Sequence, residues 1–201
     1  AIQSGPLPLR IAARNDEGHV TTMTPDHDAP ERIEWQGDYI TAKTRGRWEY
    51  VGRARNIRAA VILPLIGNDV ILVEQYRVPL GRNCIELPAG LIGDEEGKAD
   101  EDDLSAAGRE LEEETGYRAA KLEDIGQFFS SPGMVSESFT LVRATGLDRV
   151  GEGGGTASED IAVHRVARAG LKEFLDRKRT EGCGVDVRLL LLLGQDIIAG
   201  E

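Results

Sequence analysis

Three glutamates share one side of a helix that the sequence predicts over residues 104–115. At about 100° per residue, Glu110, Glu113 and Glu114 fall within one arc. An apolar stripe adjoins this arc and consists of Leu104, Ala107 and Leu111. The carboxylates should therefore converge beside the core, where two of them about 6 Å apart repel by roughly 3 kcal/mol at an effective dielectric of about 20. A divalent cation would relieve this repulsion directly.

The other charged residues of the helix leave two interpretations open. Arg109 stands four residues before Glu113, where it can tether one of the clustered carboxylates by a charge-assisted contact. Glu112 points elsewhere and is interpreted as a surface charge. By spacing alone, the glutamates form either a metal site or a solvated face, because exposed like charges cost a helix little.

The residues around this helix follow a fixed spacing. Ten residues separate Gly90 from Glu101, and seven more lead to Arg109-Glu110-Leu111, then Glu113-Glu114 and Gly116-Tyr117. The segment resembles the Nudix box, in which five residues rather than ten follow the glycine. We place a five-residue insertion within residues 93–100, because aligning Glu96 to Gly90 would break the second spacing.

The resemblance implies an α+β fold, the Nudix α/β/α sandwich with a mixed sheet, and a hydrolase that uses Mg²⁺, with Mn²⁺ as a substitute. Water would attack one phosphorus of a nucleoside diphosphate linked to another moiety. The implied metal ligands are Glu110 and Glu114, with Glu113 and the main-chain carbonyl of Ala89 as additional candidates. Glu101 would act through water or support Arg109. Oxygen ligands of this kind suit Mg²⁺.

The catalytic base implied by the resemblance is a glutamate on a later loop. Residues 151–160 are rich in glycine and lead into a predicted strand, which suits a side chain that swings over bound metal. We choose Glu159, with Glu137 and Glu152 as competitors. His164 lies within an expected strand and is interpreted as structural.

Three further segments narrow the resemblance to ADP-ribose pyrophosphatases: residues 47–53, 73–79 and 84–92. That family implies a homodimer with a shared N-terminal sheet whose aromatic residues hold the adenine. Trp48 fits this role, with Trp35 or Tyr39 as a second face, since a purine stacks well on an indole.

The anionic part of the substrate needs donors. Arg77 and, as a second candidate, Arg53 are expected to contact the diphosphate or the terminal ribose, because arginine offers a fork to phosphate. The segment Ser131-Pro132-Gly133-Met134 also resembles a loop of the family, so Met134 is expected near the terminal ribose. The implied reaction turns ADP-ribose into AMP and ribose 5-phosphate. The alternatives are a nucleoside diphosphate sugar hydrolase, acting on GDP-mannose or UDP-glucose, and a non-catalytic nucleotide sensor.

The elements that must position these residues fall into two parts. Residues 1–56 are expected to form an N-terminal sheet element for dimerisation and substrate binding, with antiparallel strands near 33–35, 39–43 and 48–51. Residues 57–201 are expected to form the hydrolase domain. Gly67-Asn68-Asp69 should join strands 59–66 and 70–76 in a hairpin.

Further elements follow along the chain. The helix over 104–115 should be capped by Asp102 or Asp103 and ended by Gly116 in a left-handed conformation. Strands are predicted near 123–130, 138–144 and 160–166. Two helices are predicted over 171–179 and 185–198, the second apolar and packed.

Composition restricts the partners. The 201 residues include 35 acidic and 24 basic ones, a net charge of -11 that disfavours nucleic-acid binding. Cys84 and Cys183 cannot form a disulfide framework, so a reducing cytoplasm is expected. The longest apolar run, residues 189–193, is too short for a bilayer, and the N-terminus lacks the layout of a signal peptide. We therefore expect a soluble protein acting on a small molecule.

Overall fold

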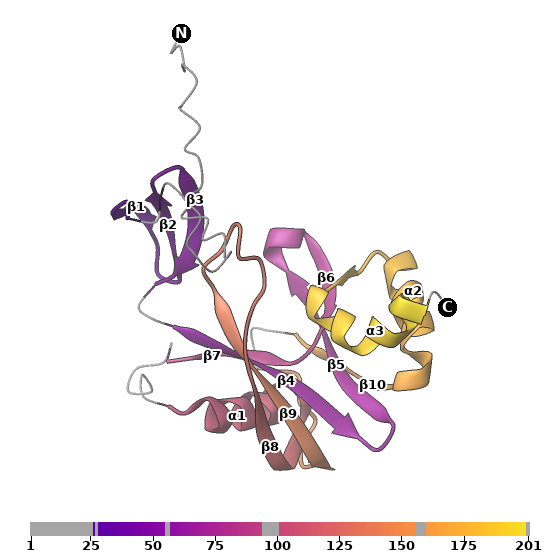
Figure 1. The fold of residues 1–201 in the computed structure, drawn as a ribbon. Coiled ribbons are helices and arrows are strands. Elements are labelled where there is room, and N and C mark those ends of the chain that lie inside the picture. The colour runs from indigo at the N-terminus through magenta and orange to yellow at the C-terminus, as the bar shows by residue number, and fades with distance from the viewer. Residues whose placement is uncertain (1–25, 27, 55–56, 94–100, 156–159, 200–201) are drawn as a thin grey trace, which may run out of the picture.

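The computed structural model describes residues 26, 28–54, 57–93, 101–155 and 160–199 (Figure 1). They form a three-stranded antiparallel sheet and an eight-stranded mixed sheet with helices on both of its faces. The expected α+β class, with a mixed sheet and a small separate N-terminal sheet, is confirmed. The division of the chain at residue 57 stays a prediction. Among the described residues, no helix has the length and apolar character needed to cross a membrane.

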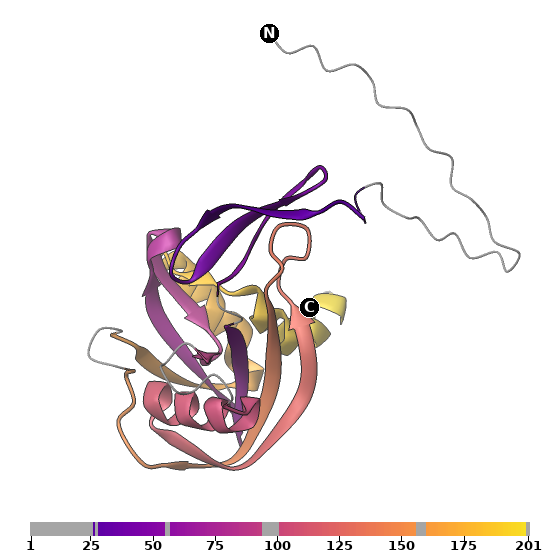
Figure 2. The same cartoon turned by 90° about the vertical axis from the view of Figure 1, so that its left-hand side faces the viewer.

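The N-terminal sheet consists of β1 (Glu31–Gln36), β2 (Ile40–Arg45) and β3 (Trp48–Arg53), in that order. β1 and β3 contain the segments predicted for them, and β2 begins one residue later than predicted. Figure 2 shows the loop between β8 and β9 reaching this sheet. There Val51 donates from its main-chain N to Met134 O at 3.0 Å and accepts from Ser136 N at 2.9 Å.

The main sheet has the strand order β11-β6-β5-β4-β9-β8, with β10 beside β5 and β7 beside β4. Its strands are β4 (Arg58–Ile66), β5 (Asp69–Arg77), β6 (Arg82–Glu86), β7 (Ala89–Ile92), β8 (Tyr117–Phe129), β9 (Ser138–Arg149), β10 (Ala162–Ala167) and β11 (Gly184–Val185). The predicted hairpin joins β4 to β5. The pairs β4·β9 and β6·β11 are parallel, and the other pairs are antiparallel.

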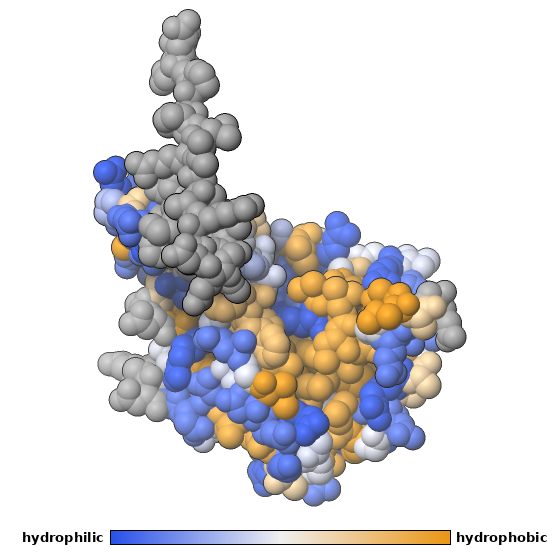
Figure 3. Space-filling view, viewed as in Figure 1, coloured by the Kyte–Doolittle hydropathy of each residue, from blue (hydrophilic) through white to orange (hydrophobic). Residues whose placement is uncertain are grey.

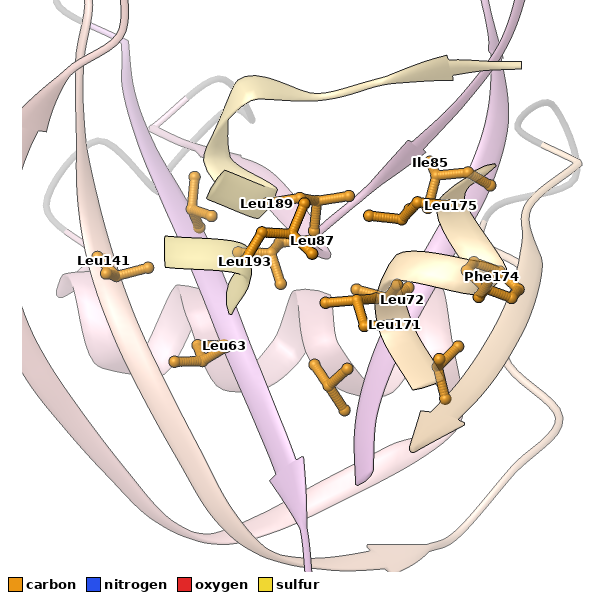
Figure 4. Close-up of a cluster of buried hydrophobic side chains, with 13 residues drawn as sticks. Leu63, Leu72, Ile85, Leu87, Leu141, Leu171, Phe174, Leu175, Leu189 and Leu193 are labelled. Atoms are coloured by element: carbon orange, nitrogen blue, oxygen red, sulfur yellow. The ribbon is translucent and has the colours of Figure 1, made fainter. Parts of the chain in front are cut away.

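In the described part of the chain, three α-helices cover the main sheet: α1 (Asp103–Thr115) on one face and α2 (Leu171–Thr180) and α3 (Leu190–Ala199) on the other (Figure 1). Short 3₁₀ turns lie at η1 (Val78–Leu80), η2 (Arg168–Gly170) and η3 (Val187–Leu189). Figure 4 shows the hydrophobic core cluster on the face covered by α2 and α3, in which Leu171 and Leu175 from α2 meet Ile85 of the sheet.

The caps of α1 match the prediction. Asp102 accepts hydrogen bonds from the main-chain N of Leu104 at 3.0 Å and of Ser105 at 3.3 Å. Gly116 ends the helix with φ of 73°, a conformation that a residue with a Cβ adopts with strain. A Cβ there would also overlap the main chain of Gly151.

The predicted helix over 185–198 is wrong in its first turn. The chain forms β11 and then η3, and α3 begins only at Leu190. The physical reason is that β11 pairs with β6 and Asp186 caps η3 through the main-chain N of Arg188 at 2.7 Å. The expectation that this helix is packed holds in part. Leu193 is buried, but Figure 3 shows apolar side chains at the surface over this region, among them the exposed Leu190, Leu191, Ile197 and Ile198.

Candidate active site

A cavity of about 640 Å³ brings together five of the charged residues predicted from the sequence: Arg53, Arg77, Glu110, Glu114 and Glu137. Strands β3, β5, β6 and β7, helix α1 and the segment after β11 all contribute to its wall. Its charged residues are Arg53, Arg77, Arg188, Glu86, Glu110, Glu114, Glu137 and Asp186. Three arginines face five carboxylates, so the wall has a net formal charge of −2. An anionic ligand therefore needs additional positive charge in this cavity.

Two glutamates of α1 reach the cavity. Glu114 is 4% exposed and accepts a hydrogen bond from the main-chain N of Ala89 at 3.1 Å. Glu110 lies against Gly90, where a Cβ would overlap the side chain of Glu110. The glycine of the motif is thus required because α1 and β7 approach closely at this point.

Glu113 does not line the cavity, so the expected convergence of three carboxylates is wrong for this residue. Its side chain is 47% exposed and pairs with Arg109 at 3.2 Å. The arc spanned by the three glutamates is wider than the side of α1 that packs against the sheet, and Glu113 lies outside that side. Glu112 is a surface charge as expected, paired with Arg118.

Arg109 ties the motif together. Its Nη1 lies 2.9 Å from Glu110 Oε1, and its Nη2 lies 3.4 Å from Glu101 Oε2. Burial lowers the pKa of the guanidinium, but these carboxylates outweigh burial and raise that pKa above its ordinary value. Arg109 therefore stays charged and fixes the side chain of Glu110, as the spacing predicted.

The start of α1 is fixed from the sheet. Arg58 donates from Nη2 to the main-chain O of Glu101 at 2.7 Å, and its Nη1 lies 2.8 Å from Asp103 Oδ1. Thr140 donates to Asp103 Oδ2 at 2.6 Å. These contacts hold Glu101 beside Arg109. Of residues 93–100, where the insertion is predicted, residues 94–100 lie outside the described part of the chain.

The donor set of the cavity fits a hard divalent cation. Among the described residues, no group of three or more His, Cys, Asp and Glu side chains is arranged to hold a metal ion. Mg²⁺ nevertheless needs only one or two carboxylates, because it keeps several waters and binds substrate phosphates. Glu110 and Glu114, with Ala89 in the same wall, meet this requirement.

The two predicted arginines both line the cavity, and each is held by a carboxylate. Arg77 pairs with Glu86 through Nε at 2.7 Å and Nη2 at 2.8 Å. Arg53 pairs with Glu137, with Nε at 2.7 Å. The hydrogen bond to the Glu86 carboxylate has the largest effect on the pKa of Arg77 and raises it, whereas burial lowers it. Both cations are thus oriented before any ligand binds.

The residues predicted from the sequence did not include Glu86, Asp186 and Arg188. Glu86 is 3% exposed although it carries a charge, and its position within the apolar stretch Cys84-Ile85-Glu86-Leu87 was a usable signal. A buried carboxylate requires partners. Asp186 and Arg188 were assigned to a helix, which concealed their role.

The aromatic residues lie away from this cavity. Trp48 lines a second cavity of about 440 Å³, together with Tyr50, Pro132 and Val135. Trp35 and Tyr39 are each 56% exposed and Met134 is 62% exposed, and these three line neither cavity. Within the described part of one chain, none of the four meets the α1 carboxylates, because the N-terminal sheet rests on the β8–β9 loop.

The three candidate bases differ in place. Glu159 lies outside the described residues. Glu137 lines the cavity and pairs with Arg53, whereas Glu152 is exposed and does not line it. The loop that carries Glu152 is attached to the end of α1, where Gly154 donates from its main-chain N to Glu114 O at 2.8 Å.

Two other side chains of reactive types, those of His164 and Cys84, are given no catalytic role. His164 contacts Glu74 at 2.8 Å and packs edge-on against Phe174, which agrees with a structural role. Burial, reinforced by Glu86, raises the pKa of Cys84 to about 12. That thiol therefore remains protonated and is no nucleophile.

Comparison with known proteins identifies the family. Residues 55–178, more than half of the chain, match the family described as "NUDIX domain". The "Methanol dehydrogenase activator" of Bacillus methanolicus is 43% identical over 90 residues, which cover 45% of this chain and 46% of that protein. The "ADP-ribose pyrophosphatase" of Bacillus subtilis (strain 168) is 47% identical over 78 residues, covering 39% of this chain and 40% of that protein.

The matched part thus spans less than half of the length of these two curated relatives. A solved structure, "Crystal structure of ADP compounds hydrolase", has a TM-score of 0.57 and 22% sequence identity. The superposition covers 76% of this chain and 92% of that chain. At this identity the likeness concerns the fold.

Proposed function

This chain belongs to the Nudix family, and we propose that it is a Mg²⁺-dependent pyrophosphohydrolase that cleaves ADP-ribose to AMP and ribose 5-phosphate. The observation that carries the proposal is one cavity in which Glu110 and Glu114 share the wall with three arginines. Carboxylates for a cation and guanidinium groups for phosphate are the two requirements of pyrophosphate hydrolysis.

The charge of the cavity supports a role for the metal. Each arginine of the wall is already paired with a carboxylate, and the wall as a whole has a net formal charge of −2. A diphosphate bridge is itself anionic, so it would be repelled without a divalent cation. Glu110 and Glu114 would hold that ion, with the carbonyl of Ala89 as an additional ligand.

The metal would activate water and neutralise charge on the leaving phosphate. The side chains around the metal would have separate roles. Arg109 keeps Glu110 in place through the 2.9 Å contact. Arg77 and Arg53 would donate hydrogen bonds to the oxygens of the diphosphate. A loop glutamate would accept the proton of the attacking water, and we propose Glu159, with Glu137 and Glu152 as competitors.

The adenine would stack on Trp48, with Trp35 or Tyr39 as the second face. Because Trp48 lines a different cavity from Arg77 within one chain, we propose that the stacking residue comes from a second subunit. We therefore propose a homodimer that shares the N-terminal sheet. The exposed aromatic and apolar residues of that sheet, among them Ile33 and Trp35, support an interface there. A monomeric mass in analytical ultracentrifugation at micromolar concentration would contradict it.

A substrate panel tests the activity. The purified protein is incubated with Mg²⁺ and ADP-ribose, GDP-mannose or UDP-glucose, and the products are separated by chromatography. ADP-ribose should turn over fastest and yield AMP. If GDP-mannose or UDP-glucose turns over faster, that sugar nucleotide replaces ADP-ribose as the proposed substrate. If none of the three compounds turns over, a non-catalytic sensor is favoured. The remaining proposals are a cytoplasmic setting and the absence of nucleic-acid and membrane partners.

A further inference from the structure

The segment after β11 supplies part of the cavity wall from the far end of the chain. β11 pairs in parallel with β6, with Gly184 opposite Cys84 and Val185 opposite Ile85. The main-chain N of Asp186 then donates to Ile85 O at 3.0 Å. This register brings the next residues, Asp186 and Arg188, beside Glu86 of β6.

Arg188 is held from two sides. Its Nε and Nη2 lie 2.7 Å and 2.8 Å from the two carboxylate oxygens of Asp186, and its guanidinium carbon lies 5.8 Å from the centre of the Phe139 ring. Burial lowers the pKa of Arg188, but Asp186 and Glu86 outweigh burial and raise it. The group is therefore a fixed cation.

Arg188 also lies beside a second cation. Arg77 and Arg188 both approach Glu86 Oε2, at 2.8 Å and 3.4 Å. Each of the two uses Nε and Nη2 on a carboxylate, and its Nη1 has no hydrogen-bond partner among the described residues. Two like charges held this close, each with donors to spare, favour an anion between them.

We propose that Arg188 is a substrate-binding residue that forms, with Arg77, a pair of guanidinium groups for the diphosphate of a nucleoside diphosphate. The inference rests on the proposed function and extends the binding site to the C-terminal segment. The oxygens of a diphosphate can accept hydrogen bonds from the outer Nη1 groups of both arginines, while Glu86 and Asp186 hold the inner Nε and Nη2 donors in place.

The test measures binding separately from hydrolysis. Calorimetric titrations with Mg²⁺ use two diphosphates with a non-hydrolysable bridge, α,β-methylene-ADP and methylenediphosphonate. Arg188→Gln should weaken the binding of both by about tenfold to a hundredfold, the range expected for a hydrogen bond to a charged group. Arg188→Lys keeps the charge but loses the forked guanidinium group. Its affinity for both compounds should lie between those of the wild type and Arg188→Gln. If the wild type binds neither compound, or if Arg188→Gln binds both as the wild type does, the inference is overturned.

A matched control is available on α2. Arg177 lies over Phe174 at 5.2 Å and makes a 3.7 Å ion pair, but it does not line the cavity. Arg177→Gln should therefore leave both affinities unchanged. If Arg188→Gln does not fold, as judged by its thermal transition, Arg188→Lys serves as the test instead. Wild-type affinity of Arg188→Lys for both analogues would then overturn the inference.

A double mutant separates direct binding from an effect through Arg77. Direct binding predicts that Arg188→Gln weakens the analogues further when Arg77→Gln is already present. If the loss disappears in that background, Arg188 acts only by holding Glu86 and the assignment is wrong. If the wild type binds both analogues but does not hydrolyse ADP-ribose, while Arg188→Gln binds the analogues more weakly, the result counts against the proposed reaction and leaves the inference standing.

Discussion

Gly90 of β7 lies so close to Glu110 of α1 that a Cβ on the glycine would overlap the Cγ and Cδ atoms of the glutamate. The contact joins two segments that are twenty residues apart in the chain. It sets where one of the two cavity carboxylates lies, because the other side of Glu110 is held by Arg109 at 2.9 Å.

Gly90→Ala should therefore fold and lose activity. The clash involves a side chain that can move, so the fold tolerates it, but the Glu110 carboxylate must leave its position. Displacements of about 1 Å at a catalytic group can cost about a hundredfold in rate. The rate and the apparent Mg²⁺ affinity are measured beside Gly170→Ala, where a Cβ meets nothing within 4 Å. Equal activity of the two variants would count against the role of Glu110.

Glu114→Gln should abolish most hydrolysis while the protein stays folded. Its amide can still accept the hydrogen bond from Ala89, now made at 3.1 Å, but a neutral side chain is a poor ligand for a divalent cation. We expect a fall in kcat of about a hundredfold or more. Glu112→Gln is the control on the same helix, since Glu112 pairs with Arg118 outside the cavity. Unchanged Mg²⁺-dependent activity of Glu114→Gln would refute the metal role.

Arg58→Gln tests whether the start of α1 is a positioning device. The substitution removes the contacts to Glu101 O and Asp103, so Glu101 and Arg109 lose their support. We expect the metal affinity to fall by about tenfold, on the scale of residues that orient ligands. Arg143→Gln, which breaks a comparable ion pair with Glu123 on the sheet, should have no such effect. A shift of the Mg²⁺ titration in both variants or in neither would exclude the positioning role.

Acid stability should depend on Glu74. Burial raises the pKa of this carboxyl, but hydrogen bonds from Lys178, Asn83 and His164 outweigh burial and bring the pKa down to about 2, from 4.5. A folded-state pKa below the unfolded one stabilises the protein above the unfolded value, and this stability is lost as the pH falls through the folded value. The loss should therefore occur between about pH 4.5 and pH 2.

Urea midpoints between pH 2 and pH 6 measure this contribution. Glu74→Gln should be less stable than the wild type at pH 6, and the difference should shrink towards pH 2, as the carboxyl takes up its proton. Other carboxylates titrate in both proteins and cancel in the difference. A difference that stays constant with pH would show that Glu74 has no depressed pKa.

Local features of the fold were predictable because nearby residues determine them. The side chain of Asp102 caps the first turn of α1, and Gly116 takes the left-handed conformation that ends it. The hairpin between β4 and β5 follows from a turn sequence between two apolar runs. The helical spacing likewise predicted the contact of Arg109 with Glu113, and the family resemblance offered the contact with Glu101 as one of two roles for that residue.

The segment after residue 184 was not predictable from its own residues. Its leucines are typical of a helix, and the isolated pattern predicts one over 185–198. Val185, together with Gly184, instead pairs with β6, which lies about a hundred residues earlier in the chain. Tertiary pairing thus overrode a local preference, and it brought Asp186 and Arg188 into the cavity.

The amino-acid sequence alone therefore determined the helix with its carboxylates, the arginine that ties them and the family to which they point. Only the tertiary structure decided that Glu113 faces solvent, that Trp48 lies in a different cavity from Arg77, and that Glu86 is shared by Arg77 and Arg188. Periodicity and spacing describe one element at a time. Which side of an element is covered, and which distant charge completes a cavity, depends on how strands remote in the sequence pair and pack.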